Sequence, residues 1–214
     1  MDYFMKSAGI RVPCIREYDI ETEENLKKGT IMTLSSGAAA KASGSDTVLG
    51  ILAEDYNTEK DQLNPRSGSG RARIIVSPGT ICRQPLYETV AEENATATSL
   101  KINGYTVPSE ANSFKGGYIK LVYKAETSEN ADFVGKTRKI TASSNDTLTV
   151  ESGGIPNTGD IYAILPPAGF SYIALASDGT SFDLSSSKSS VAQIVSCMPE
   201  NDYCEIGFLK TFFN

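Results

Sequence analysis

The sequence of 214 residues contains no histidine and no tryptophan. Without histidine there can be no Ser-His-Asp or Cys-His catalytic arrangement, and no zinc or iron site with imidazole ligands. No stretch approaches the roughly 20 apolar residues that cross a bilayer as a helix. These absences argue against an enzyme and predict a protein without a membrane partner.

Positive charge is also scarce, because 20 Lys and Arg residues against 26 Asp and Glu residues leave a net charge of −6. A nucleic-acid-binding protein needs a basic surface that displaces counterions from phosphates. The neighbouring carboxylates Glu54 and Asp55 would point to opposite faces of a strand. The Gly-rich loop before Arg71 lacks the Gly-Lys-Ser/Thr of a phosphate-binding loop. The sequence therefore predicts no catalytic site, no cofactor or metal, and no nucleic-acid partner.

The cysteines are four in number and widely spaced: Cys14, Cys82, Cys197 and Cys204. The first residues do not show the charged start and apolar stretch of a secretory signal. We therefore expect a chain made in a reducing cytoplasm, with its cysteines as thiols. A Cys197–Cys204 bridge is the alternative, because residues 199–202 have the composition of a turn that would bring the two together.

Turn residues punctuate the chain, which has 18 Gly and 9 Pro and short apolar runs between them. Runs at roughly ten-residue spacing with a turn signal between them are typical of small sheets and barrels. Residues 48–53 are apolar on both faces and predict a strand buried on two sides, in which Gly50 indicates a bulge or a close backbone approach. Only residues 88–98 suggest a helix. The predicted fold class is all-β.

Three segments share a recognisable order. Residues 27–34 hold a Gly-Thr-apolar strand, residues 48–55 contain Gly50-Ile-Leu-Ala-Glu-Asp55, and residues 71–80 hold an apolar strand followed by Pro78-Gly79. In this order they resemble the head decoration (cement) proteins of tailed bacteriophages, of the lambda type. The resemblance implies a β-tulip-like core.

A second pattern occupies residues 113–165, where glycines, apolar residues and single charged residues recur in a fixed order. It resembles the small β modules inserted in phage structural proteins, and implies a small β-barrel or sandwich. The matching residues are Gly135, Arg138, Ile140, Leu148, Thr149, Val150, Pro156, Gly159, Asp160, Tyr162 and Ile164.

Together the two resemblances imply three parts: an extended N-terminal arm at 1–25, a decoration-type β core at 26–112 plus 166–214, and an inserted β module at 113–165. They also imply a structural protein, not an enzyme, that binds the outer surface of a mature capsid as a homotrimer and stabilises the shell against internal pressure. The implied partner is the major capsid protein, and the implied location is the virion. The alternative is a head-fibre base or adhesin-type module that recognises carbohydrate or a host surface.

The arm suggests how a capsid would be bound. Its segment 10–15 could add as a strand to a sheet edge of the major capsid protein, or it could pack back on its own trimer. Two arginines two positions apart on a strand share a face and could hold a carboxylate-bearing partner. The candidate capsid-binding residues are Ile10, Arg11, Val12, Cys14, Ile15, Arg71 and Arg73.

Overall fold

The structure, a computed structural model, describes residues 2–5, 14–20, 24–60, 68–76, 80–85, 87–90, 96–101, 108, 110–144, 146–189 and 191–212. These residues form seventeen strands and two short 3-10 helices, η1 (Asn130–Phe133) and η2 (Pro199–Asn201). All neighbouring strands within the sheets pair antiparallel. The predicted all-β class is therefore confirmed.

The strands form three larger sheets and one two-stranded hairpin. The five-stranded sheet has the order β2 (Ile15–Asp19), β6 (Arg71–Ile75), β5 (Gly50–Leu52), β3 (Ile31–Ser35), β4 (Ala38–Lys41). The four-stranded sheet has the order β1 (Asp2–Met5), β7 (Thr80–Pro85), β17 (Tyr203–Phe208), β16 (Ala192–Met198). The six-stranded sheet has the order β8 (Tyr87–Val90), β13 (Ile161–Leu165), β10 (Tyr118–Tyr123), β11 (Thr137–Ser144), β12 (Thr147–Val150), β9 (Ser99–Lys101), and the hairpin pairs β14 (Ile173–Leu175) with β15 (Phe182–Leu184).

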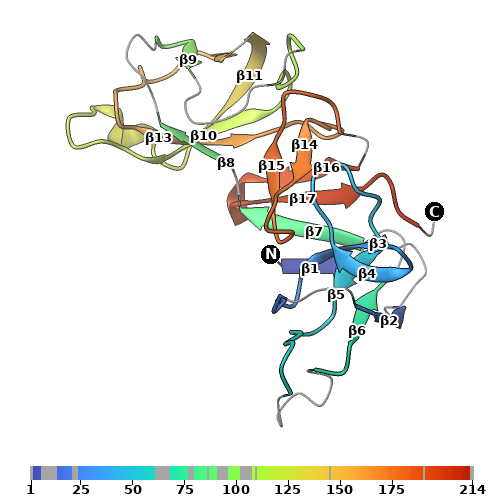
Figure 1. Cartoon of the computed structure of the whole chain (residues 1–214). Helices are drawn as coiled ribbons and strands as arrows, with labels where there is room; N and C mark the ends of the chain where they lie inside the picture. The colour runs from blue at the N-terminus through green and yellow to red at the C-terminus, as the bar shows by residue number, and fades with distance from the viewer. Residues whose placement is uncertain are drawn as a thin grey trace.

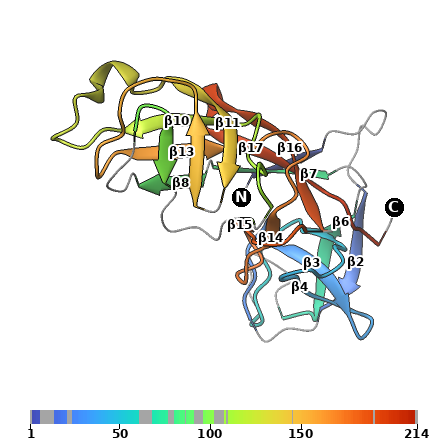
Figure 2. The same cartoon turned by 90° about the horizontal axis from the view of Figure 1, so that it is seen from above.

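The sheets are arranged along the length of the molecule. The five-stranded sheet lies at one end and the six-stranded sheet at the other, with the four-stranded sheet and the hairpin between them (Figure 1). The view from above keeps this order (Figure 2). One apolar core runs through all three parts, since Ile51, Cys82 and Ile119 belong to the same cluster of buried residues.

The five-stranded sheet is nearly closed on itself. Its outer strands approach each other, because Ile20, just after β2, forms a parallel bridge with Ala39 of β4. The enclosed space is filled by a separate apolar cluster: Leu26, Met32, Ala39, Leu49, Leu52, Tyr56, Ala72, Ile74 and Val76. We call this unit the barrel.

The central strands of the barrel are buried on both faces, as predicted for 48–53. Met32 and Leu52 point into the barrel, whereas Ile31 and Ile51 point outward into the core shared with the other sheets. All four side chains have no exposed area. Gly50 is required by a close approach, because a Cβ there would lie 2.2 Å from the carbonyl oxygen of Ile75. The predicted close backbone approach is confirmed.

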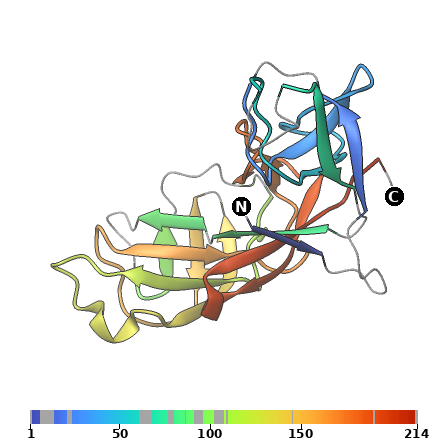
Figure 3. The same cartoon turned by 90° about the horizontal axis from the view of Figure 1, so that it is seen from below.

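The six-stranded sheet bends at β11. This strand pairs with β10 through 137–139 and with β12 through 140–144, so it passes from one half of the sheet to the other. The bend encloses Leu100, Ile119, Ile140, Leu148 and Ile164, all fully buried. Figure 3 shows this curved sheet from below.

Most residues of the second sequence pattern have structural roles in this sheet. Arg138 donates from Nη1 to the carbonyls of Ala97 and Gly154, each at 3.2 Å. Gly135 and Gly159 adopt positive φ angles of 80° and 91°, which glycine tolerates best. Ile140, Leu148, Val150, Tyr162 and Ile164 are buried. The pattern therefore specifies how this sheet folds.

The boundary expected at residue 113 does not coincide with a sheet boundary. β10 to β13 do share one sheet, but β8 and β9, from 87–101, pair with β13 and β12 of that sheet. The expected helix at 88–98 is wrong at 88–90, because β8 takes those residues and 96–98 form a turn; residues 91–95 lie outside the described part of the chain. Pairing with β13 outweighs the roughly helical spacing of Ala, Glu and Val residues over 88–98.

The N-terminal residues also differ from the extended arm expected at 1–25. β1 pairs with β7 in the four-stranded sheet, and β2 pairs with β6 in the barrel over the full length of both strands. The described parts of 1–25 thus supply edge strands to the protein's own sheets. The backbone groups of β6 gain hydrogen-bond partners this way, which a free arm would leave unsatisfied.

The hairpin β16–β17 carries a disulfide. Cys197 and Cys204 are directly opposite in the strand register and are joined, with a Cα–Cα distance of 4.1 Å. The expectation of four thiols is therefore wrong for this pair, and the turn expected at 199–202 is present as η2. Cys14, which is exposed, and Cys82, which is buried, are not part of a disulfide. Burial raises the pKa of the Cys82 thiol to about 12.

Two sets of contacts hold the hairpins against the sheets. The amide of Gln84 in β7 pairs with the backbone of Phe182 in β15, with both bonds between 2.7 and 2.8 Å. Lys120 in β10 donates to the carbonyl of Pro199 at 2.8 Å and forms an ion pair with Asp202. The disulfide-bonded hairpin is thereby tied to the six-stranded sheet.

Candidate functional site

The candidate capsid-binding residues are only partly brought together. Ile10, Arg11 and Val12 lie outside the described residues. Cys14 and Ile15 are exposed at the start of β2, and Ile15 is directly opposite Ile75 in the register. Ile15 therefore lies on an edge of the barrel, because β2 is an outer strand.

The two arginines share the outer face of β6, as the alternation predicted. Arg71 forms ion pairs with Glu17 at 3.7 Å and Asp19 at 3.5 Å, both from β2 of the same chain. The carboxylates that pair with Arg71 therefore belong to the same chain. All three side chains are substantially exposed, so each pair contributes little to stability.

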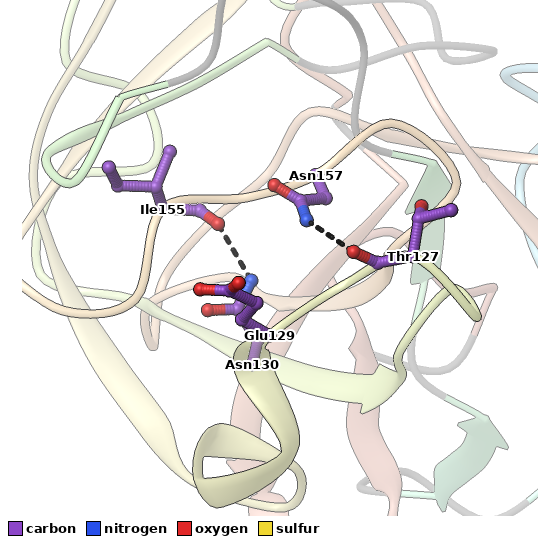
Figure 4. A pocket seen from close by; sticks show the side chains of 5 residues that line it. All are labelled: Thr127, Glu129, Asn130, Ile155 and Asn157. Carbon is purple, nitrogen blue, oxygen red and sulfur yellow. Dashed lines mark hydrogen bonds between the residues drawn. The ribbon is translucent and has the colours of Figure 1, made fainter.

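A polar pocket of about 430 Å³ lies at the other end of the molecule, in the six-stranded sheet. It is formed where the β10–β11 connection meets the β12–β13 connection, and its lining residues are Thr127, Glu129, Asn130, Ile155 and Asn157 (Figure 4). The β10–β11 connection forms the tip farthest from the barrel in Figure 1. We call this the tip pocket.

Two hydrogen bonds cross the tip pocket. The Asn130 side chain donates from Nδ2 to the carbonyl of Ile155 at 2.7 Å, and the Asn157 side chain donates to the carbonyl of Thr127 at 3.3 Å. Both hydrogen bonds are drawn in Figure 4. Each connection therefore holds the other through an asparagine.

Asp160 holds both asparagines in place through hydrogen bonds. It is fully buried, and its carboxylate accepts from the backbone N–H of Ala125 (2.9 Å) and Asn157 (3.0 Å). It also accepts from the Ser128 hydroxyl (3.1 Å) and the Asn130 amide (3.0 Å). One buried side chain thus ties 125–130 to residue 157.

Burial by itself would raise the pKa of Asp160. The hydrogen bonds from Asn157, Ala125, Asn130 and Ser128 outweigh it and hold the pKa below the ordinary value for an aspartate. The carboxylate is therefore ionised at neutral pH, and its charge is offset by oriented donors. Buried groups that are satisfied in this way make a network rigid.

The arrangement suits binding better than catalysis. In the tip pocket no cysteine, serine or lysine stands beside a base, so an activated nucleophile is missing from its lining. The described residues contain no group of three His, Cys, Asp or Glu side chains placed to hold a metal ion. Among the same residues, no helix has the length and hydropathy needed to cross a membrane.

The sequence did not predict the tip pocket, although some of the residues that support it belong to the second sequence pattern. Pro156, Gly159 and Asp160 are part of the second sequence pattern, whereas Thr127, Glu129 and Asn157 carry no motif of their own. The cluster of Gly, Pro and Asn at 153–159 predicts a turn and nothing about its partner loop. The one sequence signal was a single aspartate between a turn and an apolar strand.

Comparison of the chain with protein-family models, with curated proteins and with solved structures gives no match.

Proposed function

We propose that the protein is a structural component of a tailed-phage virion that binds the outer surface of the expanded capsid as a homotrimer. The observation that carries the proposal is the placement of the three segments resembling decoration proteins. Residues 27–34, 48–55 and 71–80 contribute β3, β5 and β6, which are adjacent in the barrel. Segments that form one contiguous unit are a stronger basis for a resemblance than scattered matches.

Physical considerations favour this role. A protein that binds only the expanded lattice stabilises that lattice by mass action. A trimer that contacts several capsid subunits dissociates slowly, because its contacts must break together. Such a role needs stable antiparallel sheets, which the described residues form.

The barrel is the proposed capsid-facing end. Its outer strand β2 exposes Ile15, at 38% of its full area, on the same face as Glu17 and Asp19, which pair with Arg71. The six-stranded sheet would then project from the shell. In this proposal Ile15 makes apolar contact with the major capsid protein, and Arg73 adds a positive charge on the same face.

The proposal is tested with capsids of the phage that encodes the chain, assembled without this protein in precursor and expanded forms. We expect the purified protein to sediment with expanded capsids only, and cryo-electron microscopy to show three copies around each occupied site. Absence of sedimentation with both forms contradicts the proposal.

Two matched variants test the orientation. Ile15→Asp charges an exposed side chain on the barrel, and Val134→Asp charges a similarly exposed one at the distant tip, where Val134 is 44% exposed. We expect Ile15→Asp to lower capsid occupancy and Val134→Asp to leave it unchanged. The reverse result would place the six-stranded sheet against the capsid.

A further inference from the structure

The tip pocket has polar groups that are not engaged in hydrogen bonds within the described part of the fold. Asn130 donates its side-chain amide hydrogens within the protein, to the carbonyl of Ile155 and the carboxylate of Asp160. The Glu129 carboxylate and the Thr127 hydroxyl, in contrast, make no hydrogen bond with the described residues, and Asn157 retains its amide oxygen and one N–H. Asn130 therefore positions the pocket, while the other three polar groups are available to a ligand.

The pocket also has one apolar wall. Ile155 is the most exposed large apolar side chain among the described residues, at 58%, although its carbonyl is held firmly by Asn130. An isoleucine held at the rim of a polar pocket supplies a flat apolar contact beside hydrogen-bonding groups. Small-ligand sites combine apolar surface with a few fixed polar groups in this manner.

We infer that the tip pocket binds a saccharide. A pyranose ring presents several hydroxyl groups in its plane and C–H groups on its face. Glu129, Thr127 and Asn157 offer acceptors and donors for the hydroxyls, and Ile155 offers a contact for the C–H face. The volume of about 430 Å³ falls within the range of roughly 300–1,000 Å³ of small-molecule sites.

Other ligand classes fit the lining less well. Phosphates and carboxylates would be repelled by Glu129, and no lysine or arginine lines the pocket. A divalent cation would find one carboxylate, whereas oxygen sites for calcium use six to eight ligands. A purely apolar ligand would leave the three polar groups unsatisfied.

The site is rigid before any ligand arrives. Asp160 fixes Asn130 and Asn157 through side-chain and backbone hydrogen bonds of 3.0 Å. Binding then orders few groups, which lowers its entropic cost. This inference goes beyond the proposed capsid role and does not depend on it, since every residue it uses lies in the six-stranded sheet or its connections.

Saturation-transfer NMR on the full chain tests the inference. The probes are the methyl glycosides of glucose, galactose, mannose and rhamnose, and binding of calcium chloride is measured separately by isothermal titration calorimetry. We expect transfer to at least one glycoside, with a Kd of about 1 mM, as is usual for few hydrogen bonds and little buried area. Transfer to none of the four overturns the inference.

Variants assign the signal to the pocket. Asn157→Ala removes a ligand contact but keeps the backbone N–H bonded to Asp160, and we expect at least tenfold weaker binding. Glu129→Gln keeps an acceptor and removes the charge, so a neutral sugar should lose less than tenfold. Glu126→Gln, on the same connection but outside the lining, is the control and should bind normally.

Two results would contradict the site. Unchanged glycoside binding by the Asn157→Ala, Glu129→Gln double variant would place the sugar elsewhere. Calcium binding that Glu129→Gln abolishes, without any glycoside transfer, would make this a cation site. Capsid sedimentation of the same variants is expected to be normal, so failure of this inference and failure of the capsid proposal are separate outcomes.

Discussion

The barrel and the six-stranded sheet are both small antiparallel β units, yet they are held together differently. The barrel relies on apolar strands buried on two faces and on one place where two backbones nearly touch, at Gly50. The six-stranded sheet adds polar groups that are bonded within the fold, namely the buried Asp160, which joins its connections, and the partly buried Arg138, which binds two carbonyls. The barrel thus suits a firm attachment, and the six-stranded sheet suits exposed loops that must keep one shape.

The largest expected effect comes from breaking the barrel at Gly50. Gly50→Ala places a methyl group against the Ile75 carbonyl, so β5 and β6 must separate, and we expect a loss of about 3–5 kcal/mol in the free energy of unfolding. Gly37→Ala is the control: its neighbourhood is open and only its φ of +90° is unfavourable, at a cost of about 1 kcal/mol. Urea denaturation compares the two. Equal losses of unfolding free energy in the two variants would show that the close approach to Ile75 does not add to the cost of Gly50→Ala.

The next effect tests the polar framework of the six-stranded sheet. Asp160→Ala leaves the donors of Ala125, Ser128, Asn130 and Asn157, which are buried or partly buried, without this acceptor. We expect a loss of about 3 kcal/mol, together with faster amide hydrogen exchange at 125–130 and unchanged exchange in the barrel. Asp183→Ala, at an exposed position of β15, is the control and should have little effect. Exchange that rises equally in both units would show that they unfold as one.

A medium effect is expected at the disulfide-bonded hairpin β16–β17, which lies between the two units (Figure 1). Replacing Cys197 and Cys204 with alanine opens a short cross-strand loop, with a sequence separation of 7, and should cost about 2 kcal/mol. The wild type should show a similar loss on full reduction with dithiothreitol, and the variant should be insensitive to it. A thermal midpoint unchanged by reduction would mean that the bridge does not stabilise the fold.

Acid should weaken the six-stranded sheet more than the barrel. The pKa of Asp160 is lower in the folded protein than in the unfolded chain, so its stabilisation is complete above the unfolded pKa of about 3.9 and is lost as the pH falls through the folded value. We expect the free energy of unfolding to fall below about pH 4, and Asp160→Asn to reduce that slope. A slope identical in the two proteins would assign the acid sensitivity to other carboxylates.

The smallest effect is expected on the outer face of the barrel. Arg71→Ala removes exposed ion pairs with Glu17 and Asp19 and should change stability by less than about 0.5 kcal/mol, with no difference at high salt. Denaturant titrations at low and high salt measure this. A larger loss would mean that these pairs hold β2 in the barrel.

Local features of the fold could be predicted from the sequence. The apolar run at 48–53 indicated a strand buried on both faces, and Gly50 indicated a close approach, because both follow from side-chain size along a few consecutive residues. The alternation that places Arg71 and Arg73 on one face is equally local. The sequence did not reveal that Arg71 already faces Glu17 and Asp19, since that depends on β2 pairing with β6.

The sequence by itself determined the all-β class, the turns and the strands with the strongest apolar runs, since these depend on short stretches of chain. Only the tertiary structure decided which strands pair: β7 joins β17 from 122 residues away, with Arg83 beside the buried Glu205. It also made 88–90 a strand and brought Glu129 and Asn157 into the lining of one pocket, where the backbone of Asn157 is bonded to the buried Asp160. Such pairings depend on the free energy of a whole core, which no local pattern contains.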